Sequence, residues 1–206
     1  SSSDIKGIIL SGSPFSVADP NAPHLEETVF KANKPLLGIC YGLHLLVKTL
    51  GGKVVQSQTR EYGKALLTIL EKRGISEGFG NEMVCWMSHG DSVKEIPPQF
   101  QCIAQTETCD YAAIVDDERK IWGIQFHPEV SHTPLGKEIL SNFIFNICGC
   151  SPDWTSESIV KQQIQWLRNT AQKEKVVCAL SGGVDSVTAA VLTYRAIGDQ
   201  LSCIFV

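Results

Sequence analysis

One twelve-residue stretch, PLLGICYGLHLL at residues 35–46, restricts the possible folds of this chain more than any other segment. Its first half is a continuous apolar run, typical of a buried strand, and its second half has the apolar spacing of a helix. Cys40 lies at the junction, with Gly38 and Gly42 two residues away on either side. Glycines at those positions permit a strained strand-to-helix turn. The stretch therefore predicts an α/β fold in which a thiol projects from the carboxyl edge of a sheet.

Other apolar segments support this fold class. Helix-like patterns cover residues 42–50 and 135–147, and AAIVDDERKIWGIQF at 112–126 has the two apolar arms and charged turn of a hairpin. Because the apolar segments are continuous rather than alternating, we expect a mixed, mostly parallel sheet with helices on both faces. The segments expected as strands are 5–10, 35–40, 64–70, 83–89, 100–106, 112–117 and 120–126.

The composition changes near residue 149, where GCSPDWTSES is polar and rich in turn residues. After it come a helical pattern at 157–172, a strand KVVCAL, a loop SGGVDS, a helix VTAAVLTYRAI and a strand LSCIFV. That order predicts a new βαβ unit. We expect a first domain at 1–148, a linker at 149–156, and at 157–206 the start of a second α/β domain, truncated at its second strand.

The bulk composition excludes several classes of protein. The chain of 206 residues has a formal net charge of −4 and no block of Lys or Arg, which argues against binding to nucleic acid or to an anionic membrane. No apolar run approaches the roughly 20 residues that cross a bilayer, and the first residues do not resemble a signal peptide. Its eight cysteines therefore read as reduced thiols of a cytosolic protein.

Cys40 has the position of a nucleophile, although a cysteine in an apolar strand is more often a core residue. The dipole of the following helix should lower the pKa of its thiol, and the Tyr41 N–H could stabilise an oxyanion. A second oxyanion donor could come from Gly12-Ser13, after the strand at 8–10, where a plain turn is the alternative.

A cysteine nucleophile needs a base, and the sequence offers five histidines. His127 has the best context, because it ends an apolar strand and Pro128 holds Glu129 within reach of the imidazole. The alternative is a strand-end histidine with an ordinary hydrogen bond. No role is expected for His132. The five are His24, His44, His89, His127 and His132.

Three motifs, LSGSP, GICYG and QFHPEV, together resemble the class I glutamine amidotransferase family, which hydrolyses glutamine to glutamate and ammonia. The resemblance implies that Cys40 forms the glutamyl thioester, that His127 is general base and acid, and that Glu129 orients it. It also implies an oxyanion hole made by the N–H groups of Ser13 and Tyr41. The glutamine pocket would include Gly12, His44, His89 and Asp91, with a polar structural turn as the alternative for His89 and Asp91.

Three departures from that family pattern stand out. The family usually has a second glycine where this chain has Ser13, and a substrate-holding glutamine where it has His44. The family's first strand and helix precede IKGIIL, so we expect them to be missing from this chain.

The string Ser181-Gly182-Gly183-Val184-Asp185-Ser186 resembles the pyrophosphate loop of N-type ATP pyrophosphatases. The resemblance implies that ATP binds at residues 181–187, ending at Val187, with Mg²⁺ near Asp185 and Ser186. No metal site is expected in the chain alone. The lysine of a Walker A loop is missing, and a tight turn followed by a helix cap is the structural alternative.

The order of these features, together with REYG at 60–63 and WMSHGDSV at 86–93, resembles the glutamine-hydrolysing GMP synthase family. The resemblance implies a carbon–nitrogen ligase that uses glutamine as amido donor. ATP, with Mg²⁺, would adenylate XMP, and ammonia would displace AMP to give GMP. It further implies no organic cofactor and a homodimer in the full-length protein.

Two other functions stay open. One is another glutamine amidotransferase, such as an anthranilate or carbamoyl-phosphate synthase subunit. The other is a regulatory nucleotide-binding module with a silent glutaminase, which the departures at Ser13 and His44 would favour.

Overall fold

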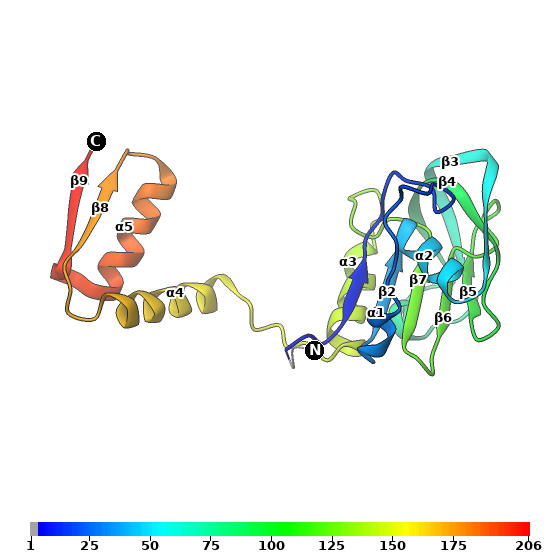
Figure 1. Cartoon of the computed structure of the whole chain (residues 1–206), viewed down its shortest axis with the longest axis horizontal. Helices are drawn as coiled ribbons and strands as arrows, with labels where there is room; N and C mark the ends of the chain where they lie inside the picture. Colours follow the sequence, from blue (N-terminus) through cyan, green and yellow to red (C-terminus); the bar gives the residue numbers. More distant parts are fainter. Residues whose placement is uncertain (1–3) are drawn as a thin grey trace. The chain divides into compact units, whose positions relative to one another are not determined.

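The computed structural model describes residues 4–206, except for the side chains of residues 57–60. The chain divides into two compact units, Ser1–Cys150 and Ser151–Val206 (Figure 1). No helix in the described part of the chain has the length and apolar character to cross a membrane.

The described residues of the first unit form a seven-stranded sheet in the order β1-β2-β7-β6-β5-β3-β4. The strands are β1 (Ile8–Leu10), β2 (Leu36–Ile39), β3 (Lys53–Ile69), β4 (Glu82–Glu95), β5 (Gln101–Gln105), β6 (Ala113–Asp116) and β7 (Ile121–Ile124). The helical segments are α1 (Thr28–Lys31), α2 (Tyr41–Thr49), the 3₁₀ turn η1 (Gly74–Ser76), α3 (Gly136–Ser141) and the π-helical η2 (Asn142–Ile147).

The mixed α/β class is confirmed, but the expectation of a mostly parallel sheet is wrong. Among the described strands of the first unit, β2 pairs in parallel with β1 and β7, and the other pairings are antiparallel. Short connections join β5 to β6 and β6 to β7, and a strand that returns after a short connection pairs antiparallel. Buried and more exposed residues also alternate along β4, the pattern of a sheet with one covered face.

Helices cover both faces of the parallel part of the sheet, as expected. Leu36 of β2 packs in one cluster with Leu43 and Leu46 of α2. Its neighbour Leu37 belongs to a second cluster with Phe143 of η2. Consecutive strand residues point to opposite faces, so these two clusters lie on opposite sides of β2. The sheet therefore holds α2 on one side and the α3–η2 segment on the other.

The second unit contains α4 (Ser156–Ala171), β8 (Val176–Leu180), α5 (Val184–Ile197), the 3₁₀ turn η3 (Gly198–Gln200) and β9 (Leu201–Phe205). Strands β8 and β9 pair in parallel around α5, which is the βαβ order expected from the sequence. Thr155 caps α4, because its hydroxyl accepts from the Ser158 N–H at 3.1 Å while the Ser158 hydroxyl accepts from the Thr155 N–H at 2.9 Å. Arg168 Nε donates to Ala196 O at 2.9 Å, which ties α4 to α5.

Candidate active site

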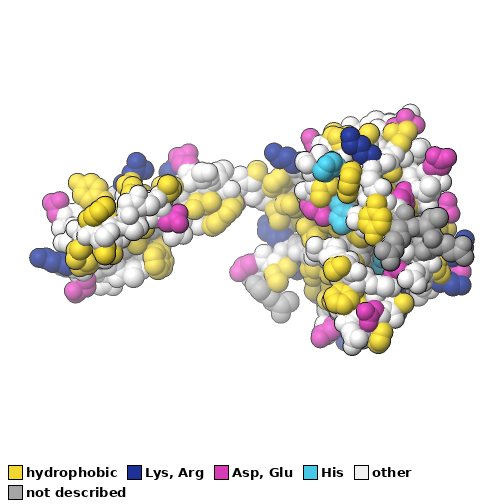
Figure 2. All heavy atoms as spheres, turned by 90° about the horizontal axis from the view of Figure 1, so that it is seen from above, with side chains coloured by type: hydrophobic (Ala, Val, Ile, Leu, Met, Phe, Trp, Pro, Cys, Tyr) yellow, Lys and Arg dark blue, Asp and Glu magenta, His cyan; other side chains and the backbone are white. Residues whose placement is uncertain are grey.

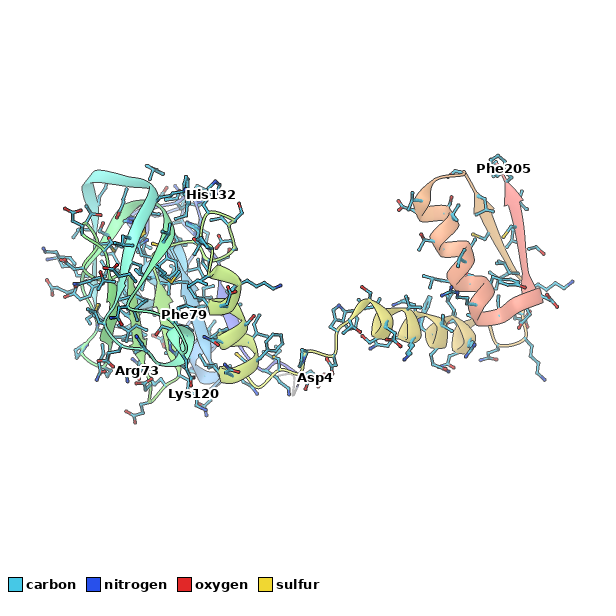
Figure 3. All side chains as sticks on the ribbon, turned by 180° about the vertical axis from the view of Figure 1, so that it is seen from behind. Asp4, Arg73, Phe79, Lys120, His132 and Phe205 are labelled. Carbon is cyan, nitrogen blue, oxygen red and sulfur yellow. The ribbon has the colours of Figure 1, made fainter. Side chains whose placement is uncertain are left out.

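The parallel strands β1, β2 and β7 place three loops at one edge of the sheet, because parallel strands end on the same side. Gly12 follows β1, Cys40 follows β2, and His127 follows β7. Figure 3 shows that His132, in the segment after β7, lies at the end of the first unit opposite Lys120, which precedes β7. Segments far apart in the sequence therefore converge at this edge.

Cys40 occupies the strained turn between β2 and α2. Its φ of 52° and ψ of −104° lie in a region that residues with a side chain rarely adopt. A Cβ on Gly38 would lie 2.7 Å from the backbone of Gly42, and a Cβ on Gly42 would lie 2.2 Å from Leu10 O. Both glycines are therefore required by close backbone approaches, one within the turn and one against β1.

Cys40 is 5% exposed, and its thiol lies among polar groups. Its Sγ is 3.6 Å from Ser88 O and 3.8 Å from Gln125 Nε2. Burial raises the pKa of Cys40 to about 11, although the Tyr41 backbone N–H and the Gln125 amide lower it. The N–H of Tyr41, at the N-terminus of α2, lowers this pKa as expected, but the net change is upward because desolvation of the thiolate outweighs the nearby donors.

His127 and Glu129 form a pair. His127 Nδ1 lies 2.7 Å from Glu129 Oε1, so an Nδ1–H donates to the carboxylate. His127 Nε2 is buried and has no hydrogen-bond partner among the described residues. In this tautomer Nε2 carries the lone pair, which makes it the nitrogen able to take a proton. Within the same residues, no hydrogen bond joins Cys40 to His127.

Thr133 fixes the backbone of His127. Its hydroxyl donates to His127 O at 2.6 Å and accepts from the Trp86 N–H at 3.0 Å. The His127 N–H in turn donates to Trp86 O at 3.0 Å. Thr133 is 3% exposed, so these bonds are protected from water. The sequence reasoning missed this residue, whose only signal is its place six positions after His127.

The two predicted oxyanion donors belong to the start of α2 and to the loop after β1, and both segments line the same cavity as Cys40. The Tyr41 backbone N–H interacts with the Cys40 sulfur and lowers the pKa of that thiol. A Cβ on Gly12 would lie 3.2 Å from His127 Cε1 and 3.7 Å from Cys40 Cβ, so the backbone after β1 approaches both residues closely. Ser13 Oγ accepts from the Phe15 N–H at 3.3 Å, which holds the loop in a turn.

Asp91 and His89 both lie on β4. Asp91 holds the segment that follows β1, and His89 joins Asp91 to Glu61 of β3. Asp91 Oδ2 accepts from Ser16 Oγ at 2.6 Å and from the Val17 N–H at 3.3 Å. His89 Nδ1 lies 2.8 Å from Asp91 O, and its Nε2 lies 3.1 Å from Glu61 Oε2. Both ring nitrogens of His89 thus face acceptor oxygens, and Glu61 joins the site without having been predicted.

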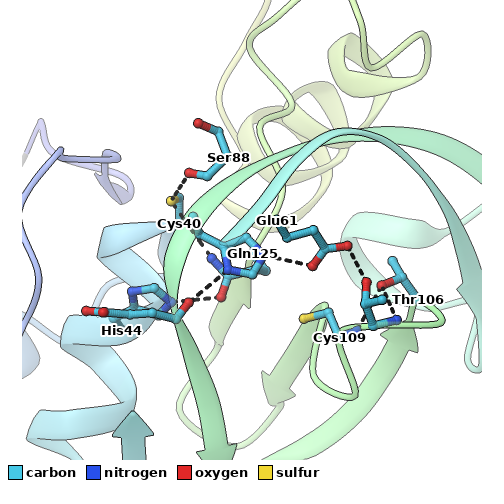
Figure 4. Close-up of polar contacts among 10 residues, drawn as sticks. Cys40, His44, Glu61, Ser88, Thr106, Cys109 and Gln125 are labelled. Carbon is cyan, nitrogen blue, oxygen red and sulfur yellow. Dashed lines mark hydrogen bonds and ion pairs between the residues drawn. The ribbon is translucent and has the colours of Figure 1, made fainter. Parts of the chain in front are cut away.

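His44 contacts Gln125 through its ring. Its Nε2 lies 2.8 Å from Gln125 Oε1, and Gln125 Nε2 lies 3.8 Å from Cys40 Sγ (Figure 4). Burial lowers the pKa of His44, which keeps the imidazole neutral. Gln125 is fully buried and was also missed by the sequence reasoning. Its signal was a polar residue inside the apolar run that leads to His127.

All the residues predicted for this unit line one cavity of about 550 Å³. Figure 2 shows histidine side chains at the surface of this unit, next to hydrophobic and acidic ones. The cavity therefore brings thiol, imidazole and carboxylate groups to one opening. Its predicted members are Gly12, Ser13, Cys40, Tyr41, His44, His89, Asp91, His127 and Glu129, and its other members include Phe15, Gln56, Tyr62 and Ser88.

The second unit contains a separate candidate site at residues 181–187. Gly182 has a φ of +78°, and Gly183, the residue before α5, provides no side-chain cap for the helix. The first N–H groups of a helix have no partner within the helix, so this end of α5 offers donors to an anion. Ser186 Oγ donates to Gly183 O at 3.0 Å and accepts from the Ser181 N–H at 3.3 Å, which holds the loop against the helix. Val184, Asp185 and Val187 lie at the start of α5 and are exposed.

Two family models match this chain, one in each unit. The model of the family Glutamine amidotransferase class-I matches residues 1–147, and the model of the NAD synthase family matches residues 157–205. A GMP synthase (glutamine-hydrolyzing) of Caldanaerobacter subterraneus is 50% identical over 98% of this chain, and one of Thermomicrobium roseum is 51% identical over 98%. The chain spans only about 40% of the length of these curated relatives.

Solved structures share the fold. A protein of Thermoplasma acidophilum, named as a GMP synthase subunit, superposes with a TM-score of 0.61 at 30% identity, over 71% of this chain and 74% of that chain. A glutamine amido transferase of Methylobacillus flagellatus gives a TM-score of 0.52 at 24% identity, over 72% of this chain and 58% of that chain, and supports the fold alone. The chain belongs to the class-I glutamine amidotransferase family.

Proposed function

We propose that this chain belongs to a glutamine-hydrolysing GMP synthase, an ATP-dependent carbon–nitrogen ligase that uses glutamine as amido donor. The names and sequence identity of the relatives support the proposal, as does the order of a glutaminase-like cavity followed by an SGGVDS loop. We take residues 1–148 as the glutaminase domain, 149–156 as the linker and 157–206 as the start of the ATP pyrophosphatase domain.

In the first unit, Cys40 would attack the side-chain carboxamide carbon of glutamine. Its proton would pass to His127 Nε2, and the N–H groups of Ser13 and Tyr41 would stabilise the tetrahedral oxyanion. His127 would then protonate the leaving ammonia, which leaves a glutamyl thioester on Cys40. Water, deprotonated by the same imidazole, would hydrolyse the thioester to glutamate. Glu129 would keep His127 in the tautomer that has a basic Nε2.

The observation that carries this proposal is the arrangement of His127. Its Nδ1 is held by Glu129 at 2.7 Å, while its buried Nε2 has no partner in the described part of the chain. A buried polar nitrogen without a partner costs free energy, of the order of 1–3 kcal/mol, so such groups are uncommon outside functional sites. His127 and Cys40 line the same cavity, where a substrate atom would complete the contact.

In the second unit, the N–H groups at the start of α5 would bind the phosphates of ATP. The loop fits such a ligand, because Gly183 leaves the helix end uncapped and Gly182 lets the backbone turn with a positive φ. Asp185 and Ser186 would lie near the Mg²⁺ that accompanies ATP, and this ion would neutralise phosphate charge. Adenylation of XMP and its amination by ammonia would complete the reaction in the full-length protein, which we expect to be a cytosolic homodimer.

A regulatory module with a silent glutaminase is the second candidate. The pKa of about 11 for the Cys40 thiol favours it, because almost no thiolate is present at neutral pH without a partner base. The two candidates differ in whether Cys40 becomes a nucleophile at all: in a glutaminase the binding of glutamine or of a nucleotide activates it, and in the silent module no ligand does.

The test is glutamate release from glutamine by the full-length protein, measured with and without ATP and XMP. We expect release that is lost in Cys40→Ala and strongly reduced in His127→Asn. AMP and pyrophosphate should form from ATP only when XMP is present. If no condition releases glutamate, the first unit is not a glutaminase. If ATP plus XMP yields no pyrophosphate, the synthetase assignment is wrong.

A further inference from the structure

Gln125 and His44 link the interior of the first unit to the Cys40 sulfur. Gln125 is fully buried, and its two side-chain polar atoms have different partners: Oε1 lies 2.8 Å from His44 Nε2, and Nε2 lies 3.8 Å from Cys40 Sγ. His44 is 3% exposed, so both members of this contact are shielded from water. Figure 4 shows Gln125 between the other two side chains.

The direction of this hydrogen-bond chain decides whether the NH₂ group or the carbonyl oxygen of Gln125 faces the Cys40 sulfur. A neutral imidazole has one N–H, and when that N–H is on Nε2 it donates to Gln125 Oε1. The carboxamide then turns its NH₂ group towards Cys40. If His44 instead carried its proton on Nδ1, the carboxamide would rotate to donate to the ring, and its oxygen would face the sulfur. An N–H group stabilises a thiolate, whereas a carbonyl oxygen repels it.

We propose that His44 and Gln125 are positioning residues that stabilise the Cys40 thiolate, with His44 fixing the carboxamide of Gln125 so that its NH₂ faces the sulfur. This inference rests on the proposed role of Cys40 as nucleophile and assigns His44 a role other than direct contact with glutamine. The fixed donor partly offsets the burial that disfavours the thiolate.

Other charged and titratable groups surround the same thiol and must be considered in any pH profile. The carboxylates of Asp91 and Glu129 raise the pKa of Cys40. His127, from the segment after β7, lines the same cavity, and His89 of β4 lies close enough to His44 to lower the pKa of that imidazole. The comparison must therefore use variants that leave these groups unchanged.

The experiment measures the rate at which iodoacetamide alkylates Cys40 as a function of pH, read by mass spectrometry of the Cys40 peptide in the intact protein. Gln125→Leu removes the donor at similar volume and should raise the apparent pKa of the thiol by about one unit, an about tenfold loss of thiolate at fixed pH. His44→Leu should raise it less, because the amide can still donate part of the time. His44→Gln keeps a donor to Oε1 and should restore the wild-type profile.

Alkylation of the exposed Cys203, in the second unit, is the internal control and should not change in any variant. Thermal melting shows which variants are folded. If Gln125→Leu fails to fold, the side-chain amide resonance of Gln125 in the wild-type protein provides the second measurement. Its chemical shift should titrate together with the Cys40 thiol.

The inference would be overturned if folded Gln125→Leu showed the wild-type dependence of Cys40 alkylation on pH. It would also be overturned if the chemical shift of the Gln125 amide did not change as the Cys40 thiol titrates. A shifted thiol pKa in a protein that releases no glutamate would support the inference and refute the proposed glutaminase. Glutamate release together with an unshifted thiol pKa in Gln125→Leu would support the proposed glutaminase and refute the inference. The two claims therefore fail separately.

Discussion

Gly42→Ala is the sharpest test of how the fold builds the Cys40 turn. An added Cβ would lie 2.2 Å from Leu10 O and 2.8 Å from Leu10 Cβ, whereas ordinary contacts of a Cβ begin near 3.4 Å. The end of β1 or the start of α2 must therefore move by about 1 Å. Overpacking of a rigid interior costs about 1–3 kcal/mol, and contact with backbone rather than a flexible side chain places this variant at the upper end.

For a unit of this size, such a cost lowers Tm by roughly 4–12 °C. Leu10 directly precedes the loop that contains Gly12 and Ser13, so glutamate release should fall by at least about tenfold as the oxyanion donors shift. The assay is differential scanning fluorimetry combined with glutamate release.

Gly80→Ala is the matched control. A Cβ on Gly80 would meet only Glu82 O, at 3.8 Å, which is an ordinary contact. This variant should change stability by less than about 1 kcal/mol and leave activity intact. If Gly42→Ala melts within about 2 °C of Gly80→Ala, the close approach of β1 to α2 does not hold the site together, and the reasoning fails.

Three further predictions follow from the same contacts. Cys40→Gly should be about 1 kcal/mol more stable than Cys40→Ala by thermal melting, because only glycine adopts the φ of 52° without strain. If Cys40→Ala is instead the more stable variant, the backbone at this turn is not strained. Thr133→Val should cost about 1–3 kcal/mol and lower kcat more than it changes KM, because the His127 carbonyl and the Trp86 N–H lose their shared hydroxyl; an unchanged kcat would count against this clamp. Burial raises the pKa of Cys40 to about 11 and that of Cys85 to about 12. In the unfolded chain a thiol has a pKa of about 8.5. The stability that these neutral thiols contribute is therefore complete below about pH 8.5 and is lost as the pH rises through the folded pKa values. Tm should therefore fall above about pH 9, and less steeply in Cys85→Ala; equal slopes in both proteins would contradict the assignment.

The features that were predicted correctly from the sequence are those that depend on neighbours in the chain. The turn at Cys40 is marked by glycines at fixed distances, and α2 begins at Tyr41, one residue before the helix expected at 42–50. The hairpin of β6 and β7 follows from two apolar arms around a short charged turn. Both arise from backbone geometry within a few residues, so a local pattern contains the information.

The features that were missed depend on partners distant in sequence. Strand direction was wrong because continuous apolar runs report burial and not which strand lies alongside. The long arms β3 and β4 were only partly recognised, since Asp91 and His89 are polar residues inside a strand whose partners, Ser16 and Glu61, come from other segments. Gln125 looked like an ordinary strand residue until its contacts with Cys40 and His44 were known.

The raised pKa of Cys40 was missed for a related reason. A helix N-terminus favours a thiolate, and that effect can be expected from the order of strand, cysteine and helix. Desolvation depends on every element that covers the sulfur, including β4 and the loop after β1, and has no local signature. The opposing effects on the pKa could be compared only once the packing around the sulfur was known, and burial is the largest of them.

In the proposed mechanism, Cys40 forms a covalent glutamyl thioester with His127 as its base. The most direct measurement is rapid acid quenching of the full-length protein during turnover of labelled glutamine with ATP and XMP, followed by mass spectrometry of the Cys40 peptide. We expect a glutamyl adduct on Cys40 that appears at the rate of glutamate release and is absent in Cys40→Ala. Glutamate release without an adduct on Cys40, or with an adduct on another residue, would contradict it.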